Sequence, residues 1–252
     1  MKEWITGRNP VIEVVRAKRR QVFRLLFAAG VEEKGKILDL RKMAQMRKIP
    51  IEIVAREKLA PLGENPQGVA AEVSGYPYVD ISDITDLALR KQEDLFVLIL
   101  DVLQNPQNLG SLLRTAEAAG VHGVLIPQHR AAEVTPAVVS ASAGASEIML
   151  VAQANIARAL ADLKSQGVWV VGLDGGEGSK PLQMIPLSGP IALVVGNEGE
   201  GMRQLVRETC DYIAALPMKG EIESLNAAVA GSIAIYMTYF AREQKIETAK
   251  KK

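Results

Sequence analysis

The sequence has few of the residues on which several common kinds of site are built. Its single cysteine, Cys210, excludes an internal disulfide. Cys210 and the two histidines, His122 and His129, do not show the spacing of a metal-ligand cluster, so we expect no bound metal. Aromatic residues make up 4% of the chain, which is too few for an extended platform of stacked bases.

Long apolar runs are also missing. No stretch of about 18 apolar residues occurs, so the sequence predicts no membrane-spanning helix and no membrane partner. The first residues, MKEWITGRNP, lack the apolar core of a secretory signal. Together with the lone cysteine, these features favour a cytoplasmic protein.

The familiar nucleotide-binding and hydrolase motifs are absent as well. No G-x-x-x-x-G-K-[ST] segment occurs, which excludes a P-loop. Neither DGGEGSK over 174–180 nor GNEGEG over 196–201 has the spacing G-x-G-x-x-G, which argues against a nucleotide-binding oxidoreductase. The chain also lacks the G-x-S-x-G elbow of the α/β-hydrolases.

Charge is present in ordinary amount but is unevenly distributed. The net charge is only +1, yet residues 1–60 contain 15 Lys and Arg against 7 Asp and Glu, and the remainder is acidic. Such asymmetry indicates that the N-terminal part meets a polyanion, although a solvated charged face would give the same pattern.

The N-terminal third shows a short alternation of helical and strand patterns. With 252 residues, the chain is long enough for two domains. Apolar periodicity predicts a small α/β domain over 1–75, followed by a linker over 76–94 that contains a short helix near 84–91. Within this domain the predicted helices are 10–18 and 36–48, and the predicted strands are 22–28, 51–55 and 69–73.

From residue 95 the alternation is stronger and predicts a second domain over 95–245. The predicted strands are 96–100, 121–126, 148–151, 168–173, 191–195 and 213–216, with helices over 109–119, 156–165, 202–209 and 224–243. Strands that alternate with helices favour an α/β fold, a mostly parallel sheet covered on both faces. The last helix is apolar over much of its surface and therefore needs a partner surface.

Three unusual loops follow predicted strands. They are DVLQNPQNLG over 101–110, GNEGEGM over 196–202 and LPMKGEIESLN over 216–226. Ligands in open α/β sheets bind beyond the carboxyl ends of the strands, where such loops lie. Taken singly, each loop has an ordinary explanation, such as a capped helix start, a tight glycine turn, or Ser224 capping the last helix.

Together and in this order, the loops resemble the three motifs of the SpoU (TrmH-type) branch of the SPOUT RNA methyltransferases. The matching segments are NPQNLGSLLR over 105–114, VGNEGEGM over 195–202 and LPMKGEIESLN over 216–226. The N-terminal segments GRNPVIEV over 7–14 and NPQGVAA over 65–71 resemble the RNA-substrate-binding domain of the same family. Among its members, the chain is most similar to the RlmB-like bacterial 23S rRNA guanosine-2′-O-methyltransferases.

This resemblance implies a fold that periodicity does not predict. The family's catalytic domain contains a deep trefoil knot, which would span about 191–240 here, whereas general topology rules argue against knots. The resemblance also implies a small L30e-like N-terminal domain and a bent S-adenosyl-L-methionine as cofactor. It further implies a homodimer with the active site at the subunit interface, which would provide the partner for the last helix.

The family's site residues can be placed by motif position. The resemblance implies that the cofactor pocket is lined by Gly196, Leu216, Met218 and Leu225, and that the catalytic residues are Asn108, Arg114, Glu198, Ser224 and Asn226. In the family the residue at Arg114 is proposed to take the proton of the ribose 2′-hydroxyl. An arginine is nearly always protonated, so it could instead bind a phosphate or stabilise the developing alkoxide, and both roles stay open.

The RNA itself is specified less sharply. The basic N-terminal domain offers as candidate phosphate contacts Arg8, Arg16, Lys18, Arg19, Arg20 and Arg24. By resemblance the substrate is a guanosine of 23S ribosomal RNA, and the alternative is a transfer RNA ribose. A non-catalytic RNA-binding or ribosome assembly factor is a further alternative, against which the presence of Arg114, Glu198, Ser224 and Asn226 argues.

Overall fold

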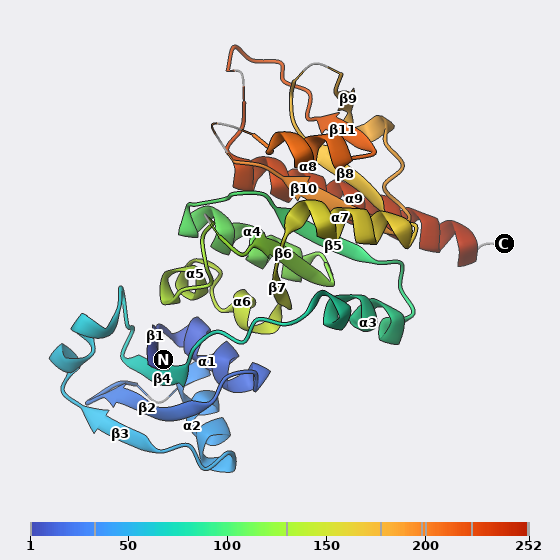
Figure 1. Ribbon diagram of the computed structural model, residues 1–252. Helices are drawn as coiled ribbons and strands as arrows, with labels where there is room; N and C mark the ends of the chain where they lie inside the picture. Colours follow the sequence, from blue (N-terminus) through green and yellow to red (C-terminus); the bar gives the residue numbers. More distant parts are fainter. Residues whose placement is uncertain are drawn as a thin grey trace. The chain divides into compact units, whose positions relative to one another are not determined.

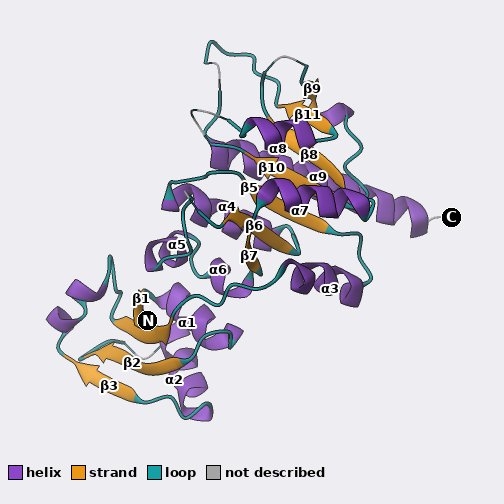
Figure 2. Ribbon diagram, in the orientation of Figure 1, coloured by secondary structure: helices purple, strands orange, loops and turns teal. Residues whose placement is uncertain are grey.

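The computed structural model describes residues 2–32, 34–129, 131–176, 178–197, 199, 201–222 and 224–250. The chain forms two compact units (Figure 1), of which the first comprises Met1–Pro77 with Glu133–Ile148 and the second Tyr78–Ala132 with Met149–Lys252. The division expected from the sequence, at 1–75, 76–94 and 95–245, stays a prediction about separately folding domains. Each unit is an α/β structure (Figure 2).

The first unit contains a mixed four-stranded sheet in the order β1-β4-β2-β3. The strands are β1 (Lys2–Thr6), β2 (Val22–Ala28), β3 (Ile51–Val54) and β4 (Val69–Ser74). β4 runs antiparallel to both β1 and β2, whereas β3 runs parallel to β2. Helices α1 (Arg8–Ala17) and α2 (Lys36–Met46) pack on each other, and the chain makes two 3₁₀ turns, η1 (Arg56–Lys58) and η2 (Ala60–Leu62).

Two short helices from later in the sequence also belong to this unit. They are α5 (Pro136–Ala141), which packs on β1, and α6 (Ala145–Ile148), which packs on α1. A buried ion pair holds α6 in place, because Arg20 Nε donates to Glu147 Oε2 at 3.0 Å and Arg20 Nη1 donates to Glu3 Oε2 at 2.6 Å. Burial raises the pKa of the Glu147 carboxyl, and the charge of Arg20 opposes this rise.

The second unit is built on a seven-stranded sheet in the order β7-β6-β5-β10-β8-β11-β9, with every adjacent pair parallel. Its strands are β5 (Phe96–Leu100), β6 (Gly123–Pro127), β7 (Val151–Ala154), β8 (Trp169–Leu173), β9 (Lys180–Pro181), β10 (Ile191–Val195) and β11 (Tyr212–Ala215). The central strands β5 and β10 are buried along their whole length, as expected for a parallel sheet covered on both faces.

The helices divide between the two faces. They are α3 (Ile81–Lys91), α4 (Pro106–Ala118), α7 (Ile156–Ser165), α8 (Gln204–Thr209) and α9 (Ala227–Lys250), with one 3₁₀ turn, η3 (Leu182–Met184). Ala192 and Val194 of β10 belong to the apolar cluster that includes residues of α7 and α8. A Cβ on Gly231 of α9 would lie 3.1 Å from Val195 and 2.7 Å from Leu112 of α4. Because neighbouring side chains of a strand point to opposite faces, α4 and α9 cover the other face.

The structure differs from the sequence-based expectation at several boundaries. The strand expected at 148–151 lies at Val151–Ala154, because the residues before it form α6. The last helix begins at Ala227 rather than at residue 224, since Asn226 caps it: Asn226 Oδ1 accepts from the backbone N–H groups of Ala228 at 2.9 Å and Val229 at 3.2 Å. Within the described residues, no helix is both long and apolar enough to cross a membrane.

Candidate functional site

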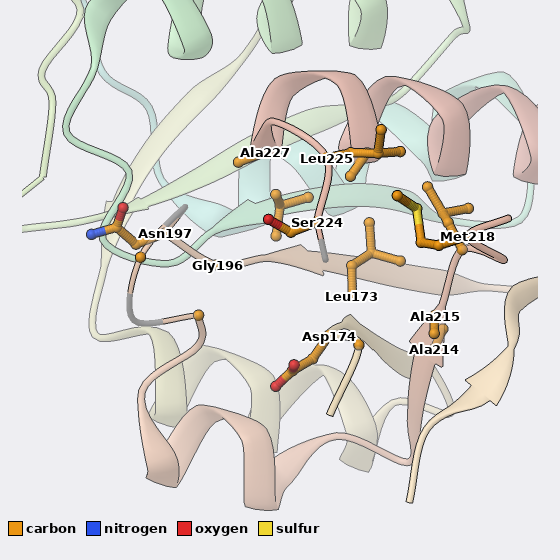
Figure 3. A pocket seen from close by; sticks show the side chains of 16 residues that line it. Leu173, Asp174, Gly196, Asn197, Ala214, Ala215, Met218, Ser224, Leu225 and Ala227 are labelled. Atoms are coloured by element: carbon orange, nitrogen blue, oxygen red, sulfur yellow. The ribbon is translucent and has the colours of Figure 1, made fainter. Parts of the chain in front are cut away.

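A cavity of about 260 Å³ opens at the carboxyl ends of β8, β10 and β11, beside the start of α9 (Figure 3). Its walls are formed by the last residues of these strands and by the loops that follow them. Of the residues singled out in the sequence, five line this cavity: Gly196, Leu216, Met218, Ser224 and Leu225. Tertiary folding thus brings two of the three sequence motifs together around one space.

Gly196 is required by the packing of its own loop. A Cβ at this position would lie 2.4 Å from the carbonyl carbon of Gly201 and 2.5 Å from the nitrogen of Met202. The loop folds back on itself through two backbone hydrogen bonds, from Asn197 N to Gly201 O at 2.9 Å and from Gly201 N to Asn197 O at 3.0 Å. The resemblance placed Gly196 in the cofactor pocket, and the structure adds this steric reason for a glycine.

The first motif reaches the third through two amide side chains. Asn108, in the first turn of α4, is buried, and its Oδ1 accepts from Asn226 Nδ2 at 3.3 Å. α4 and α9 also share a hydrogen bond between the hydroxyls of Thr115 and Ser232 at 3.0 Å. The start of α9, which borders the cavity, is therefore fixed relative to α4.

Sequence reasoning missed the residue that braces the loop 196–202. Asp101, at the end of β5, is fully buried and accepts from the backbone N–H of Arg203 at 2.8 Å and from its guanidinium Nε at 2.8 Å. The next residue, Val102, has a φ of 61°, which is unusual for a β-branched side chain. Such strain persists where surrounding contacts hold the backbone firmly. The sequence signal that could have identified Asp101 is an acidic residue directly after a buried strand.

A second missed residue is Asp174, which is part of the cavity wall (Figure 3). It accepts from Arg207 Nε at 3.0 Å and from the backbone N–H of Gly176 at 3.1 Å. The sequence signal was the pair of glycines that directly follows an acid at the end of β8. Among the described residues of the cavity wall, Asp174 is the one with an acidic side chain.

Three predicted catalytic residues, Asn108, Arg114 and Asn226, are not among the described residues that line the cavity. Arg114 is exposed on α4, and its side chain has no hydrogen bond or ion pair to any other residue that the structure describes. Its guanidinium is therefore accessible from solvent. Glu198 lies outside the described residues.

Comparison with known proteins agrees with this geometry. Residues 95–236 match the model of the SpoU rRNA Methylase family, and residues 4–79 match a model described as RNA 2′-O ribose methyltransferase substrate binding. The chain belongs to the SpoU rRNA methylase family. It is therefore an RNA methyltransferase, and the family assignment made from the three loops is confirmed.

Two relatives are similar to this chain over nearly its whole length. The chain is 40% identical over 243 residues to the putative TrmH family tRNA/rRNA methyltransferase YacO of Bacillus subtilis, covering 95% of this chain and 96% of the relative. It is 36% identical over 237 residues to the 23S rRNA (guanosine-2′-O-)-methyltransferase RlmB of Xylella fastidiosa, covering 93% and 94%. Because the similarity extends over nearly the whole length of these relatives, it includes both units of this methylase.

A solved structure shows the same fold. The SpoU methyltransferase AviRb of Streptomyces viridochromogenes, in complex with the cofactor AdoMet, matches with a TM-score of 0.78 and 26% identity over 96% of this chain and 90% of that one. This likeness confirms the predicted fold class, an α/β methyltransferase of SPOUT type with a mostly parallel sheet and a smaller N-terminal domain. The deep trefoil knot over about 191–240 stays a prediction.

The candidate phosphate contacts of this methylase differ in exposure. Arg8, Arg16 and Lys18 are exposed. Arg24 is half-buried between Glu52 and Glu72, and hydrogen bonds to these carboxylates raise its guanidinium pKa. Three of the six candidates therefore present an accessible cation on the first unit.

Two further candidates are used inside the protein. Arg19 is half-buried and donates to the backbone oxygen of Pro77 at 2.9 Å. Arg20 requires a correction, because its side chain is fully buried and neutralised by Glu3 and Glu147. It cannot reach a phosphate in this structure, and its position indicates a structural role. A count of basic residues could not distinguish such a buried cation from an exposed one.

Proposed function

We propose that this methylase transfers a methyl group from S-adenosyl-L-methionine to a ribose 2′-hydroxyl of RNA. The observation that carries the proposal is the cavity at the ends of β8, β10 and β11, which is lined by residues of the second and third sequence motifs. The cofactor is S-adenosyl-L-methionine, as in the AviRb complex, and its sulfonium supplies a strongly electrophilic methyl group.

The residues of the cavity fit this cofactor. Leu216, Met218 and Leu225 give apolar walls that suit an adenine ring, while nearby backbone N–H and C=O groups can read its edge. Asp174 adds a carboxylate that suits ribose hydroxyls or the positive charge of the cofactor. Apolar side chains together with one acidic residue suit a molecule that combines a flat ring with a sulfonium cation.

The protein's part in the reaction is positioning and charge stabilisation. Holding the 2′-oxygen in line with the methyl group can lower the barrier by up to about 7–11 kcal/mol in ideal cases. A guanidinium is a poor general base, so we assign to Arg114 the binding of an RNA phosphate and the stabilisation of charge that develops on the 2′-oxygen. Asn108, Ser224 and Asn226, with Glu198, are the proposed polar residues around the reacting groups.

A homodimer is part of this proposal. α9 exposes a stripe of large apolar side chains, in which Val229 is 48%, Ile233 40%, Tyr236 39% and Phe240 57% exposed. The spacing of these residues places them on one face of the helix. A second copy of the chain would bury this face, and in the family such a dimer places the active site at the interface.

The proposed substrate is a guanosine of 23S ribosomal RNA, with a transfer RNA ribose as the alternative. The substrate-binding match over residues 4–79 and the similarity to the RlmB of Xylella fastidiosa support the ribosomal substrate. The name of YacO, a putative tRNA/rRNA methyltransferase, includes both kinds of RNA. The cytoplasmic location also stays a prediction of the sequence.

Two measurements test the proposal. Calorimetry of the full-length protein with S-adenosyl-L-methionine should give saturable binding with one site per chain. Mass mapping of ribosomal and transfer RNA from cells that lack the protein should show one ribose methyl group missing from 23S RNA. Loss of a methyl group from transfer RNA alone would replace the proposed substrate by the alternative, and absence of cofactor binding would reject the enzymatic function.

A further inference from the structure

A second cavity lies in the first unit, within the residues that match the substrate-binding model, and that match assigns no role to the cavity itself. Its volume is about 510 Å³, and its lining is predominantly polar. It lies where α1 begins, where β2 ends, and where the loop before β4 passes. The side chains that determine its chemistry are those of Arg8, Glu32, Arg56, Asn65 and Gln67.

The loop that forms one wall is held tightly to the start of α1. Gln67 Oε1 accepts from the backbone N–H of Arg8 at 3.1 Å, and Gln67 O accepts from Arg8 Nε at 3.2 Å. The backbone nitrogen of Ala28 donates to Gly68 O at 2.9 Å. These contacts join the two N-terminal segments that resemble the family's substrate-binding domain and organise the cavity before any ligand arrives.

The same loop has a strained backbone. Asn65 has a φ of 46° and Gln67 a φ of 52°, and such left-handed conformations cost of order 1 kcal/mol each for residues with a side chain. A turn without a ligand-binding role could use glycine at these positions at little cost. Here two amide side chains are kept at the cavity instead.

The cations of the cavity remain available to a ligand. Arg8 uses Nε in holding Gln67, so both of its terminal nitrogens lack a partner among the described residues. Arg56, in η1, is exposed, and its side chain makes no hydrogen bond or ion pair with the described part of the chain. Two guanidinium groups suit a phosphate, while amide side chains pair with the edges of nucleobases.

We infer that this cavity binds a single unpaired nucleotide of the RNA substrate, with its phosphate at Arg8 and Arg56 and its base edge at Asn65 and Gln67. The inference rests on the proposed function, which it deepens by locating where the first unit recognises RNA. Unpaired bases can enter a cavity that a duplex cannot, and single-stranded elements are the usual targets of sequence-specific RNA recognition. The first unit then selects RNA that has an unpaired nucleotide, in addition to attracting RNA by its positive charge.

The test uses the full-length protein and a fluorescein-labelled single-stranded oligoribonucleotide of ten residues, with binding followed by anisotropy. A strand of the same length and charge without bases, and a blunt RNA duplex, serve as comparison probes. We expect the single strand to bind at least about tenfold more tightly than the strand without bases. Arg56→Ala should weaken binding of the single strand about tenfold, and Arg8→Ala by at least as much.

Matched variants distinguish binding in the cavity from general attraction of RNA by positive charge. Lys42→Ala removes a positive charge from an exposed position on α2 that does not line the cavity. The affinity of this variant for the single strand should change less than about twofold. Asn65→Gly keeps the left-handed backbone but removes the amide, and should abolish the preference for the strand with bases. Because the side chain of Arg56 makes no described hydrogen bond or ion pair, its variant tests the inference even if Arg8→Ala fails to fold.

The outcomes are decisive in both directions. Equal binding of the strands with and without bases, or equal effects of Arg56→Ala and Lys42→Ala, would overturn the inference. Calorimetry with S-adenosyl-L-methionine on the same preparations keeps the two proposals apart. If the unmodified protein binds the cofactor and Arg56→Ala binds the single strand normally, the proposed nucleotide site is rejected and the proposed function stands. If the unmodified protein does not bind the cofactor, the proposed function is rejected, and this inference loses its basis.

Discussion

The amide nitrogen of Asn226 lies 3.3 Å from the amide oxygen of Asn108, although the two residues are 118 positions apart in the chain. Asn226 Oδ1 also caps α9 through the N–H groups of Ala228 and Val229. One side chain thus combines two functions, since its oxygen starts a helix and its nitrogen joins the first sequence motif to the third. These functions can be separated by substitution.

Asn226→Ala removes both functions, whereas Asn226→Asp keeps the capping oxygens and loses only the N–H donor to Asn108. We expect Asn226→Ala to lower the free energy of unfolding by about 1–2 kcal/mol, the usual cost of losing a helix cap. Asn226→Asp should stay within about 0.5 kcal/mol of the unmodified protein, because a carboxylate is favourable at a helix N-terminus. Urea unfolding gives both values.

Methyl transfer by the same two variants reports on the contact with Asn108. If that contact positions the site, Asn226→Asp should lose activity while it keeps its stability. Full activity in Asn226→Asp would show that the residue acts only as a helix cap.

Asp101→Ala tests the brace between β5 and the loop 196–202. Removing one member of a buried charged pair typically costs about 3–5 kcal/mol. We expect about 2–3 kcal/mol here, because Arg203 is half exposed and water can solvate it again. Thermal unfolding with and without S-adenosyl-L-methionine would measure both the loss of stability and the weakened cofactor binding. Arg203→Lys keeps the charge and the backbone donor, so it should lose much less.

Arg114→Ala should abolish methyl transfer and leave cofactor affinity within about twofold. The guanidinium is exposed and lies outside the described cavity wall, so its removal should not disturb the cofactor. Calorimetry measures cofactor binding, and incorporation of a labelled methyl group measures turnover. Arg158→Ala removes an equally exposed arginine from α7 and serves as the control. Normal turnover by Arg114→Ala would remove this residue from the mechanism.

Ile233→Asp should convert the proposed dimer into a monomer. The substitution places a carboxylate in the middle of the exposed apolar stripe of α9, where a partner surface would have to desolvate it. Sedimentation velocity of the full-length protein should give a dimer before the substitution and a monomer after it. Gln244→Asp changes an exposed polar residue of the same helix and should leave the dimer intact. A monomeric unmodified protein would contradict the dimer directly.

His122 should make the stability of the second unit sensitive to acid. Its Nδ1 accepts from the backbone N–H of Phe96 at 3.0 Å, and its Nε2 lies 3.0 Å from Glu93 Oε2, so the bonded form is neutral. Burial lowers the pKa of His122 below 6.5, and Glu93 partly opposes this shift. A lowered pKa means that the stabilising contribution is complete above pH 6.5 and is lost as the pH falls below it.

Urea unfolding between pH 7.5 and 5 should therefore show a decrease of up to about 1.4 kcal/mol per pH unit from this residue. His122→Asn keeps an acceptor near the position of Nδ1 but cannot be protonated, so its stability should depend less on pH. His129→Asn changes an exposed histidine and serves as the control. An unchanged pH profile in His122→Asn would exclude this residue as the source of acid sensitivity.

Parts of the fold could be predicted from the sequence to the residue. The strands Phe96–Leu100 and Ile191–Val195 and the helix Ile156–Ser165 have the predicted bounds, because continuous apolar runs and helical periodicity are local signals. The strand β1 and the helices α5 and α6 were not predicted. These short elements are stabilised by contacts to distant parts of the chain, such as the pair formed by Arg20 and Glu147, which local patterns cannot reveal.

The sequence by itself determined the family, the α/β class and the three loops, because their residue types and order depend on the chain alone. Only the tertiary structure decided that Asp101 braces the second loop, that Asp174 adjoins the cavity, and that Arg20 is buried while Arg8 stays exposed. Burial and partnership are properties of residues that meet after folding. The same arginine side chain can therefore bind RNA or hold a helix, depending on which carboxylates the fold brings beside it.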